Sequence, residues 1–536
     1  MIKDNGIELR STTPTSGERA METGQESRHK YYSDDETLRR LGKQPRLQRT
    51  FGFMSTLGVS CSALCTWESL LLTSVPGLVI IGPAGLTWAL VFNWIGIIAV
   101  YAVMAELASI APTSGGQYHW VAMLAPKRVS NFLCYQTAWL TTLAWQAISC
   151  MVGYLIATLL QGIIALARPT YVPVDWHTVL LIWAFGLLAA ALNCTNSRLL
   201  ASLEGLILIL HLAGFFGVLI PMVYLSPHND PSVVFTTFMN EGLWPTQGVA
   251  FMVGYPTVAT ALLGADCAVH LAEEIEHAST VVPQALMYTI FINGGLGLAI
   301  IIAMLFCMQS LPDALAAVDT VFYPALQIFY SATRSTTGAC LMAGIVFVLS
   351  VAASVGIYAS ASRMMWSFAR DKGLPFSGHL VKLTKNSLPL YTVCATLAFT
   401  VLLSLIILGS AVALQALCSL SVAALCGSYT LPCSLLLWRR LTGGIRPYLM
   451  EPVDPEQGFL TWGPWRVPEP VGTIINIFAC MYGLLTFFWS FWPQTNPPTP
   501  ETMNWSVLVF SSVMLFSIAW YFFRAREYFK GPIREV

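Results

Sequence analysis

The chain has 536 residues, of which 55% are hydrophobic and 10% are charged, and its mean hydropathy is +0.64. The 28 lysines and arginines balance the 28 acidic residues, so nothing indicates the basic surface that a nucleic-acid partner requires. Apolar runs recur along almost the whole length. We therefore predict an all-α polytopic membrane protein.

The apolar runs are long enough for about twelve transmembrane helices. They lie near residues 51–77, 84–110, 131–160, 176–195, 199–225, 247–275, 285–308, 337–362, 389–409, 412–437, 469–492 and 505–523. Of the 28 basic residues, all but Arg168 and Arg334 fall on one side of this twelve-span arrangement. Because an excess of Lys and Arg marks cytoplasmic segments, we predict that both termini are cytoplasmic.

These spans divide the chain into four parts. Residues 1–50 are polar and charged, which predicts a disordered cytoplasmic tail and not a cleavable signal. Residues 51–441 form a core of ten spans, residues 442–523 a linker with spans 11 and 12, and residues 524–536 a cytoplasmic C-terminal tail.

Two spans contain small or polar interruptions. They fall at Gly58, Val59, Ser60, Cys61 and Ser62 in span 1, and at Leu263, Gly264, Ala265 and Asp266 in span 6. Interrupted spans at corresponding places predict a 5+5 inverted repeat with two added helices, and they point to the solute site of a secondary transporter. We expect the two breaks to face each other, with N–H groups suited to a carboxylate and carbonyls suited to a cation.

Asp266 lies at bilayer depth, where an ionisable side chain is costly and indicates function by default. Asp266, His270 and Glu273 are spaced i, i+4, i+7, so they share one helical face. A carboxylate at Asp266 suits a primary or quaternary ammonium group, or a transported proton. The alternative is that this half-helix simply emerges into the cytoplasm, with Glu273, Glu274 and Glu276 solvated.

Further ionisable residues are candidates for proton coupling. His211 lies in the middle of span 5, and histidine is the side chain that exchanges protons most readily near neutral pH; a hydrogen-bonded core histidine is the alternative. Glu106, near the end of span 2, either relays protons, caps a gate or pairs with basic cytoplasmic loops. Glu68 lies beyond the span 1 break and is expected to face an outer vestibule.

Aromatic residues could enclose a quaternary ammonium group by cation–π contact. The candidates are Trp67, Trp145, Phe251 and Tyr255, and the alternative for each is a position facing lipid or the membrane interface.

Two connections are candidates for gating. The segment Pro112–Trp120, with Gly115, Gly116 and Tyr118, is too polar for lipid and predicts a cytoplasmic gate or elbow. The segment Ser362–Pro375, with Arg370 and Asp371, is basic and amphipathic, and we expect it to lie along the inner membrane surface and to help close the cytoplasmic side.

Catalytic and metal-binding signatures are missing from the sequence. There is no GxxxxGK[ST], HExxH or GxSxG motif, the histidines do not cluster, and none of the 13 cysteines forms a CxxC pair. We therefore expect no enzyme activity, no cofactor and no bound metal.

Three stretches carry a resemblance to a known family. They are Glu106–Pro112 followed by Gly115–Trp120, Leu263–Asp266 with His270 and Glu273–Glu274, and Ala361–Met364 with Ala369–Pro375. On these residues the chain resembles the amino acid–polyamine–organocation (APC) transporters, and within them the fungal amino acid/choline permeases, which include choline and gamma-aminobutyrate carriers. The resemblance extends from about Leu41 to Leu441.

The resemblance implies that solute binds near mid-membrane between broken helices 1 and 6. In the family, the helix 1 break binds the substrate carboxylate and the helix 6 break faces its amine; these positions correspond here to Gly58–Ser62 and Leu263–Asp266. This chain has a single glycine, Gly58, where the family has a glycine triplet. Relatives that use protons carry a basic side chain in helix 5, and His211 resembles that position.

We expect a secondary active permease that takes up a small amino acid or amine, such as gamma-aminobutyrate or choline, driven by protons. A zwitterion requires both a carboxylate site and an amine site, whereas choline depends more on aromatic side chains. Export of a secondary metabolite and solute sensing without transport are the alternatives. The expected partners are the solute, protons and the lipid bilayer. The plasma membrane is the expected location, with a vacuolar or other internal membrane as the alternative.

Overall fold

The computed structural model describes residues 33–195, 197–384, 387–409, 413–447, 460–500 and 502–535. Most of the predicted N-terminal tail, residues 1–32, and part of the predicted linker, residues 448–459, lie outside the described residues. Ten of the described helices are long and apolar enough to cross a membrane. With two interrupted passages they make twelve crossings, which confirms the predicted all-α polytopic fold.

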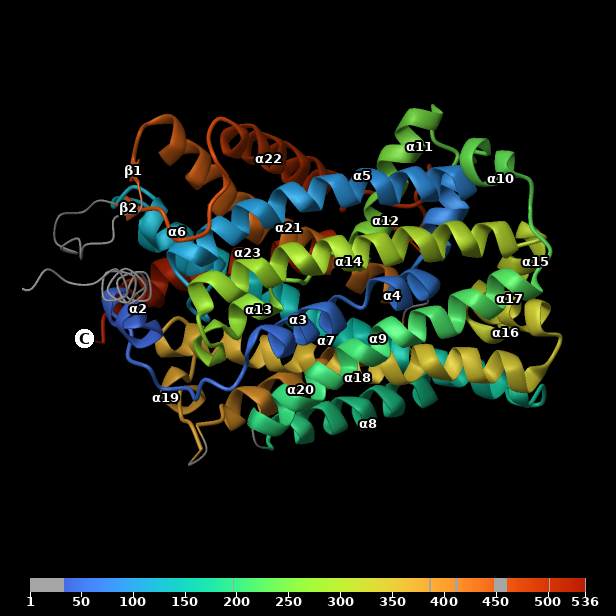
Figure 1. The fold of residues 1–536 in the computed structure, drawn as a ribbon, viewed down its shortest axis with the longest axis horizontal. Helices are drawn as coiled ribbons and strands as arrows, with labels where there is room; N and C mark the ends of the chain where they lie inside the picture. Colours follow the sequence, from blue (N-terminus) through green and yellow to red (C-terminus); the bar gives the residue numbers. More distant parts are fainter. Residues whose placement is uncertain are drawn as a thin grey trace, which may run out of the picture.

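The ten long helices run along the length of the molecule (Figure 1). In chain order they are α5 (Val75–Ile110), α7 (Ser130–Ala167), α8 (Asp175–Asn193), α9 (Ser197–Leu225), α14 (Ala278–Cys307), α18 (Thr336–Arg370), α20 (Leu390–Ser404, continued by η3, Leu405–Leu408), α21 (Ala413–Leu441), α22 (Val471–Trp489) and α23 (Ser506–Trp520). Helix α21 is central and α23 is peripheral: 72% of the apolar 18-residue stretch in the α21 span is buried within the protein, but only 17% of that in the α23 span.

Short elements cover the two ends of the bundle. At the end of α23 lie α2 (Asp34–Arg40), α6 (Gln117–Leu124), α19 (Ser377–Leu380), the strands β1 (Ile445–Arg446) and β2 (Leu460–Thr461), the π-helix η5 (Tyr521–Ala525) and α24 (Arg526–Tyr528). At the opposite end lie α10 (Pro231–Thr236), α15 (Leu311–Ala316), α16 (Val318–Val321) and α17 (Pro324–Thr333).

The first crossing is interrupted later than predicted. Helices α3 (Phe53–Leu64) and α4 (Thr66–Thr73) are separated by Cys65, which has a left-handed φ of 47°. The predicted break at Gly58–Ser62 is therefore wrong, because these residues lie within α3. Gly58 serves close packing: a Cβ there would lie 2.3 Å from the carbonyl oxygen of Glu204 in α9.

The sixth crossing is interrupted where the sequence predicts it. Helices α11 (Gln247–Gly254) and α12 (Pro256–Ala259) and the 3-10 turn η1 (Thr260–Leu262) precede the break, and α13 (Cys267–His270) follows it. Gly264 has φ +119°, a conformation that side chains other than glycine rarely adopt.

Hydrogen bonds join the two interrupted crossings. The Thr66 hydroxyl donates to the carbonyl of Ala261 at 2.7 Å, and the Ser60 hydroxyl donates to the carbonyl of Ala265 at 3.1 Å. Carbonyls freed by the helix 6 break thus bind side chains of the first crossing, as backbone groups within a bilayer require.

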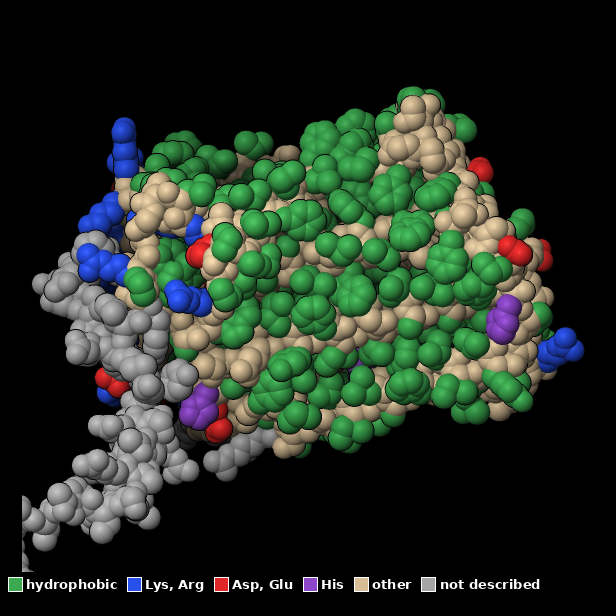
Figure 2. All heavy atoms as spheres, turned by 45° about the horizontal axis from the view of Figure 1, so that its top comes forward, with side chains coloured by type: hydrophobic (Ala, Val, Ile, Leu, Met, Phe, Trp, Pro, Cys, Tyr) green, Lys and Arg blue, Asp and Glu red, His purple; other side chains and the backbone are tan. Residues whose placement is uncertain are grey.

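Charge is segregated along the molecule. Figure 2 shows apolar side chains over the middle of one long face, with most of the visible Lys and Arg at one end; we name this the basic end. Both terminal segments lie there, because the amide of Gln44 donates to the Glu535 carboxylate at 2.9 Å. Residues 33–50, predicted as part of a disordered tail, carry α2 and pack on this end, where the Asp34 carboxylate accepts the amide of His277 at 2.7 Å.

Candidate solute site between the interrupted crossings

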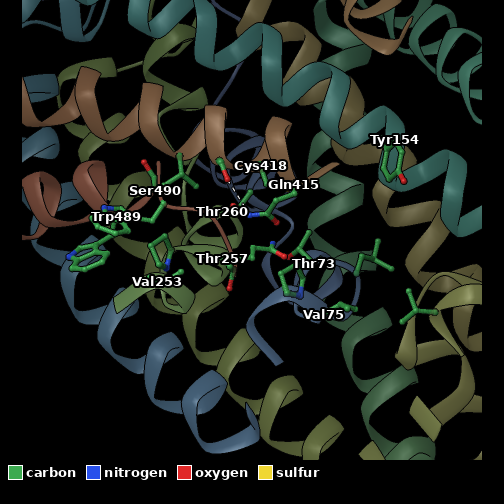
Figure 3. Close-up of a pocket in the computed structure, with 18 of the residues that line it drawn as sticks. Thr73, Val75, Tyr154, Val253, Thr257, Thr260, Gln415, Cys418, Trp489 and Ser490 are labelled. Atoms are coloured by element: carbon green, nitrogen blue, oxygen red, sulfur yellow. Dashed lines mark hydrogen bonds between the residues drawn. The ribbon is translucent and has the colours of Figure 1, made fainter. Parts of the chain in front are cut away.

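Two adjoining cavities lie beside the interrupted crossings. The outer cavity has a volume of about 280 Å³, and Figure 3 shows the side chains that line it. Val318 of α16, at the end of the molecule opposite the basic residues, is among them. The inner cavity has a volume of about 40 Å³ and lies beside the helix 1 break. Leu72, Thr260 and Val422 line both, so the two cavities form one route toward the breaks.

The outer cavity is polar without being charged. Among the described residues, no Asp, Glu, Lys, Arg or His side chain lines it. Its polar side chains are the hydroxyls and amides of Thr73, Thr257, Thr260, Gln415, Ser419, Ser490 and Gln494, and its aromatic side chains are Tyr154, Phe322, Tyr323, Trp489 and Trp492. Such a surface offers hydrogen bonds and aromatic faces to a small solute.

The inner cavity brings the two breaks together. Cys65 and Ser69 of the first crossing and Leu263 of the sixth crossing line it, with Ser350 of α18 and Ser421 of α21. The described lining contains neither a charged nor an aromatic side chain. A solute at this depth would therefore meet apolar side chains and a few hydroxyl groups, but no charged side chain.

Among the residues that the structure describes, Thr260 is the one polar residue that lines both cavities. It ends the helical part of the sixth crossing before the break. Its hydroxyl is buried and has no hydrogen-bond partner within the described protein. A buried polar group without a partner is costly, so this hydroxyl is available to a ligand.

Ser69, in the first turn of α4, lines the inner cavity. The first backbone bond into this helix runs from the amide of Ser69 to the carbonyl of Cys65, at 2.8 Å. The amides of Thr66, Trp67 and Glu68 precede it, and the first amides of a helix have no acceptor within the helix. Free amides at a helix N-terminus, together with the helix dipole, favour an anionic group such as a carboxylate.

Most residues predicted to bind solute do not line these cavities. Leu263 does, but Gly58, Val59, Ser60, Cys61, Ser62, Gly264, Ala265 and Asp266 do not. The amides of Gly264 and Ala265 donate to the Tyr101 hydroxyl at 2.9 and 3.1 Å. The break residues on this side are therefore bound by protein groups.

Asp266 is fully buried on the basic side of the break. Its carboxylate accepts hydrogen bonds from Gln117 Nε2 at 2.6 Å and from the Tyr429 hydroxyl at 2.5 Å, and His270 Nε2 lies 3.3 Å away. The expected neighbourhood of Asp266 and His270 is present, but both contact the segment after span 2 and not a cavity. Glu273 lies beyond the end of α13, so the predicted three-residue helical face is not formed.

The predicted aromatic box is not assembled. Trp67 packs beside His211 and Trp145 beside His270, with ring centroids 6.0 and 5.6 Å apart. Phe251 stacks on Tyr255, whose hydroxyl donates to Thr486 at 3.2 Å. None of the four lines either cavity, because each fills space between different helices.

His211 forms a buried acid–base pair with Glu68. His211 Nδ1 lies 2.7 Å from Glu68 Oε1, and both side chains are about 1% exposed. The other ring nitrogen of His211, Nε2, and the other carboxylate oxygen of Glu68, Oε2, have no hydrogen-bond partner within the described protein. Glu68 was expected to face the outer vestibule, and it faces α9 instead because it pairs with this histidine.

Two further carboxylates, the predicted candidate Glu106 and the unpredicted Glu204, differ sharply in their contacts. Glu106 binds Arg440 and accepts the amide of Val467 at 2.9 Å, so it has the contacts of the structural alternative. Glu204 of α9 went unnoticed in the sequence because it lies near the start of span 5. It is fully buried, accepts the Ser62 hydroxyl at 2.8 Å, and its Oε1 has no partner in the described structure.

Buried ion pairs close the basic end. Arg370 binds Glu273 through two bonds of 2.8 and 2.7 Å, and Arg363 binds Glu274 at 2.9 Å. The expectation that these two glutamates are solvated is wrong, since they are 2% and 3% exposed; Glu276 alone is exposed.

Asp371 lies at the centre of the predicted gate. It accepts Lys43 Nζ at 2.5 Å and the Tyr118 hydroxyl at 2.8 Å. Burial lowers the pKa of Lys43 from its ordinary value. The segment Ser362–Pro375, expected on the membrane surface, instead continues α18 as far as Arg370 inside the protein. Its two arginines, Arg363 and Arg370, are buried because Glu274 and Glu273 neutralise them, whereas Lys372 is exposed.

Gly115 and Gly116 allow close packing of the gate segment. A Cβ on Gly115 would lie 2.8 Å from the Tyr118 ring, and one on Gly116, which has φ +52°, would lie 2.8 Å from Val269 in α13. The predicted gating residues are thus brought together beside the helix 6 break.

Comparison with known proteins agrees with this architecture. The amino acid permease family model matches residues 51–513. The choline transporter of Saccharomyces cerevisiae is 27% identical over 486 residues, covering 90% of this chain and 83% of that relative. Amino-acid permease 2 of Neurospora crassa is 26% identical over 528 residues, covering 98% and 93%. The chain therefore belongs to the amino acid permease family within the APC superfamily, as a multi-pass membrane transporter of amino acids or organic cations.

Proposed function

We propose that the protein is a proton-driven uptake carrier for a small zwitterionic amino acid, of which gamma-aminobutyrate is the leading candidate. The observation that carries this proposal is the uncharged route to the two breaks. A zwitterion has no net charge to neutralise, and its two ends suit opposed helix ends.

The solute would bind beside the inner cavity. Its carboxylate would accept hydrogen bonds from the first amides of α4, and the free hydroxyl of Thr260 would bind its other end. The inner cavity, at about 40 Å³, is smaller than such a solute, so binding would require the surrounding helices to separate. The outer cavity, at about 280 Å³, approaches the size of ordinary ligand pockets.

The Glu68–His211 pair would couple protons to the solute. Glu68 belongs to the first turn of α4, the turn that would bind the carboxylate. An ionised Glu68 beside a neutral His211 leaves a negative charge there, which repels the carboxylate; a proton on the pair removes that net charge. Protonation and solute binding would thus favour each other, which is the requirement for symport.

Four buried ion pairs at the basic end, together with the Asp266–Gln117 hydrogen bond, would act as the cytoplasmic gate. The pairs are Lys43–Asp371, Arg363–Glu274, Arg370–Glu273 and Arg440–Glu106. Uptake then requires the gate to open after the outer side closes. Both termini are proposed to be cytoplasmic, on the strength of the positive charge at the basic end. The plasma membrane is proposed as the location because uptake of solute into the cell takes place there.

Choline is the second candidate solute, because a relative carries that name and aromatic side chains line the outer cavity. The inner cavity, however, lacks the carboxylate or aromatic faces that a quaternary ammonium prefers.

The test is uptake of labelled gamma-aminobutyrate and of choline by proteoliposomes, with and without an inward proton gradient. Gradient-stimulated accumulation of gamma-aminobutyrate alone is the expected result. Accumulation of choline alone would reject the zwitterion, binding without accumulation would indicate a sensor, and release of preloaded solute against its gradient would indicate an exporter.

A further inference from the structure

A third cavity lies at the basic end, away from the solute route. Its volume is about 400 Å³, and it lies between the loop that follows α18 and the end of the twelfth crossing. Lys372 and Ser377 line one wall, and Trp520, Arg524 and Tyr528 line the other. The route and the gate described above leave this cavity unexplained.

The cavity carries unpaired positive charge. Lys372 and Arg524 are both exposed, and neither has a hydrogen-bond or ion-pair partner among the described residues. No Asp or Glu lines the cavity in the part of the chain that the structure describes. Asp371, next to Lys372, is bound by Lys43, Tyr118 and the amide of Ile533. The cavity therefore favours an anion.

The surroundings place this cavity at the membrane interface. The apolar span α23 ends at Trp520, and Tyr528 follows two turns later; tryptophan and tyrosine favour the headgroup level of a bilayer. Phe376 and Phe523 are 82% and 87% exposed, which suits contact with acyl chains and not with water. An anion bound here would have an apolar part beside it.

The end of α23 is also irregular. Residues Tyr521–Ala525 form a π-helix, and both Arg524 and Ala525 line the cavity. Single π-helical turns are rare and often occur at functional sites, where they redirect side chains.

We propose that this cavity binds the phosphate-containing headgroup of an anionic phospholipid from the cytoplasmic leaflet. Lys372 and Arg524 would contact the phosphate, and the Tyr528 hydroxyl would donate a further hydrogen bond. The predicted orientation places the basic end at the leaflet that carries anionic lipids, where such clusters bind. Arg370 lines the same cavity and binds Glu273, so the lipid would lie directly beside the gate.

The test compares two double variants of the full chain that lose the same charge. Lys372→Gln with Arg524→Gln removes the two cavity cations that have no partner among the described residues and keeps Arg370, which is paired with Glu273. Arg526→Gln with Lys530→Gln removes two exposed cations that do not line the cavity. Native mass spectrometry counts phosphatidylserine and phosphatidylcholine retained by each protein, and elution on size exclusion verifies that each is folded.

The wild type and the Arg526/Lys530 variant should retain phosphatidylserine in preference to phosphatidylcholine. In the Lys372/Arg524 variant that preference should fall by about twenty-fivefold, since each basic side chain near an anionic bilayer contributes roughly fivefold. Equal losses in both variants, or equal retention of both lipids by the wild type, would overturn the proposal. Displacement of the lipid by soluble glycerophosphoserine would assign the cavity to a free phosphate compound and overturn the lipid source.

Discussion

The two sides of the helix breaks differ in charge: buried ion pairs occupy one side, and neutral polar and aromatic side chains line the other. On the basic side, Asp371, Glu273, Glu274 and Glu106 each bind a buried cation. On the other side, hydroxyl, amide and aromatic groups line the described cavities, without a charged side chain. Buried ion pairs cost several kcal/mol to separate without new partners, so they define one closed arrangement, whereas neutral groups bind and release a solute at low cost. In this account the buried ion pairs hold the basic side closed, and the neutral polar groups on the other side bind the solute.

The largest expected effect comes from breaking the closed side. Glu273→Gln leaves the buried Arg370 guanidinium without its counter-charge, and loss of one partner of a buried pair costs about 3–5 kcal/mol. The basic end should open and expose Cys267, which is buried in α13. Thiol labelling, located by mass spectrometry, measures this.

Glu276→Gln is the matched control, because Glu276 lies three residues away and is exposed. A folded Glu273→Gln variant with Cys267 as protected as in the wild type would show that this pair does not hold the gate.

His211→Gln should separate coupling from binding. It removes the proton acceptor beside Glu68 and keeps an amide of similar size, so gradient-driven accumulation should fall roughly tenfold, the size of a typical coupling free energy. Exchange of labelled for unlabelled solute should persist, because the change keeps the α4 amides and the Thr260 hydroxyl that would bind the solute. His228→Gln, at an exposed histidine, is the control; parallel loss of exchange would contradict the assigned role.

Thr260→Val tests the neutral side directly. The change removes a hydroxyl without a protein partner at nearly constant volume, so the KM for solute should rise about fivefold, corresponding to about 1 kcal/mol. Thr257→Val is the matched control, since that hydroxyl lines only the outer cavity and already donates to the carbonyl of Gly254. If the two changes raised the KM equally, Thr260 would not be a residue of the solute site.

Ser60→Ala should show the smallest effect. It should lower stability and leave solute binding unchanged, whereas Thr260→Val should weaken solute binding. Ser60 donates to the carbonyl of Ala265 and lines no described cavity. Its loss should lower the free energy of unfolding by about 1 kcal/mol, seen as a lower Tm, with the KM unchanged. A raised KM at unchanged Tm would restore Ser60 to the solute site.

The position of the break in the sixth crossing could be predicted from the sequence, but that in the first crossing could not. Gly264 marks the sixth crossing because a left-handed backbone there favours glycine. The first crossing breaks at Cys65, a residue type that does not signal such a conformation, whereas Gly58 allows α3 to approach α9 closely. A glycine in a span therefore indicates either a break or a close contact, and only the packing partner decides which.

The pairings could not be predicted even where the residues could. His211 and Glu68 each stand out as ionisable residues in apolar spans, yet 143 positions separate them. Lys43 and Asp371 are 328 positions apart, and Lys43 belongs to a segment whose composition resembles a disordered tail. The sequence shows which side chains need a partner, and the fold determines which partner each one has.

The most direct test of the account is the proton movement that accompanies the solute. Gamma-aminobutyrate would be added to proteoliposomes at equal internal and external pH, with an external pH indicator. The account predicts that the external medium becomes more alkaline as solute enters, and that this signal disappears in His211→Gln. Entry of solute without any proton movement in the wild type would contradict it.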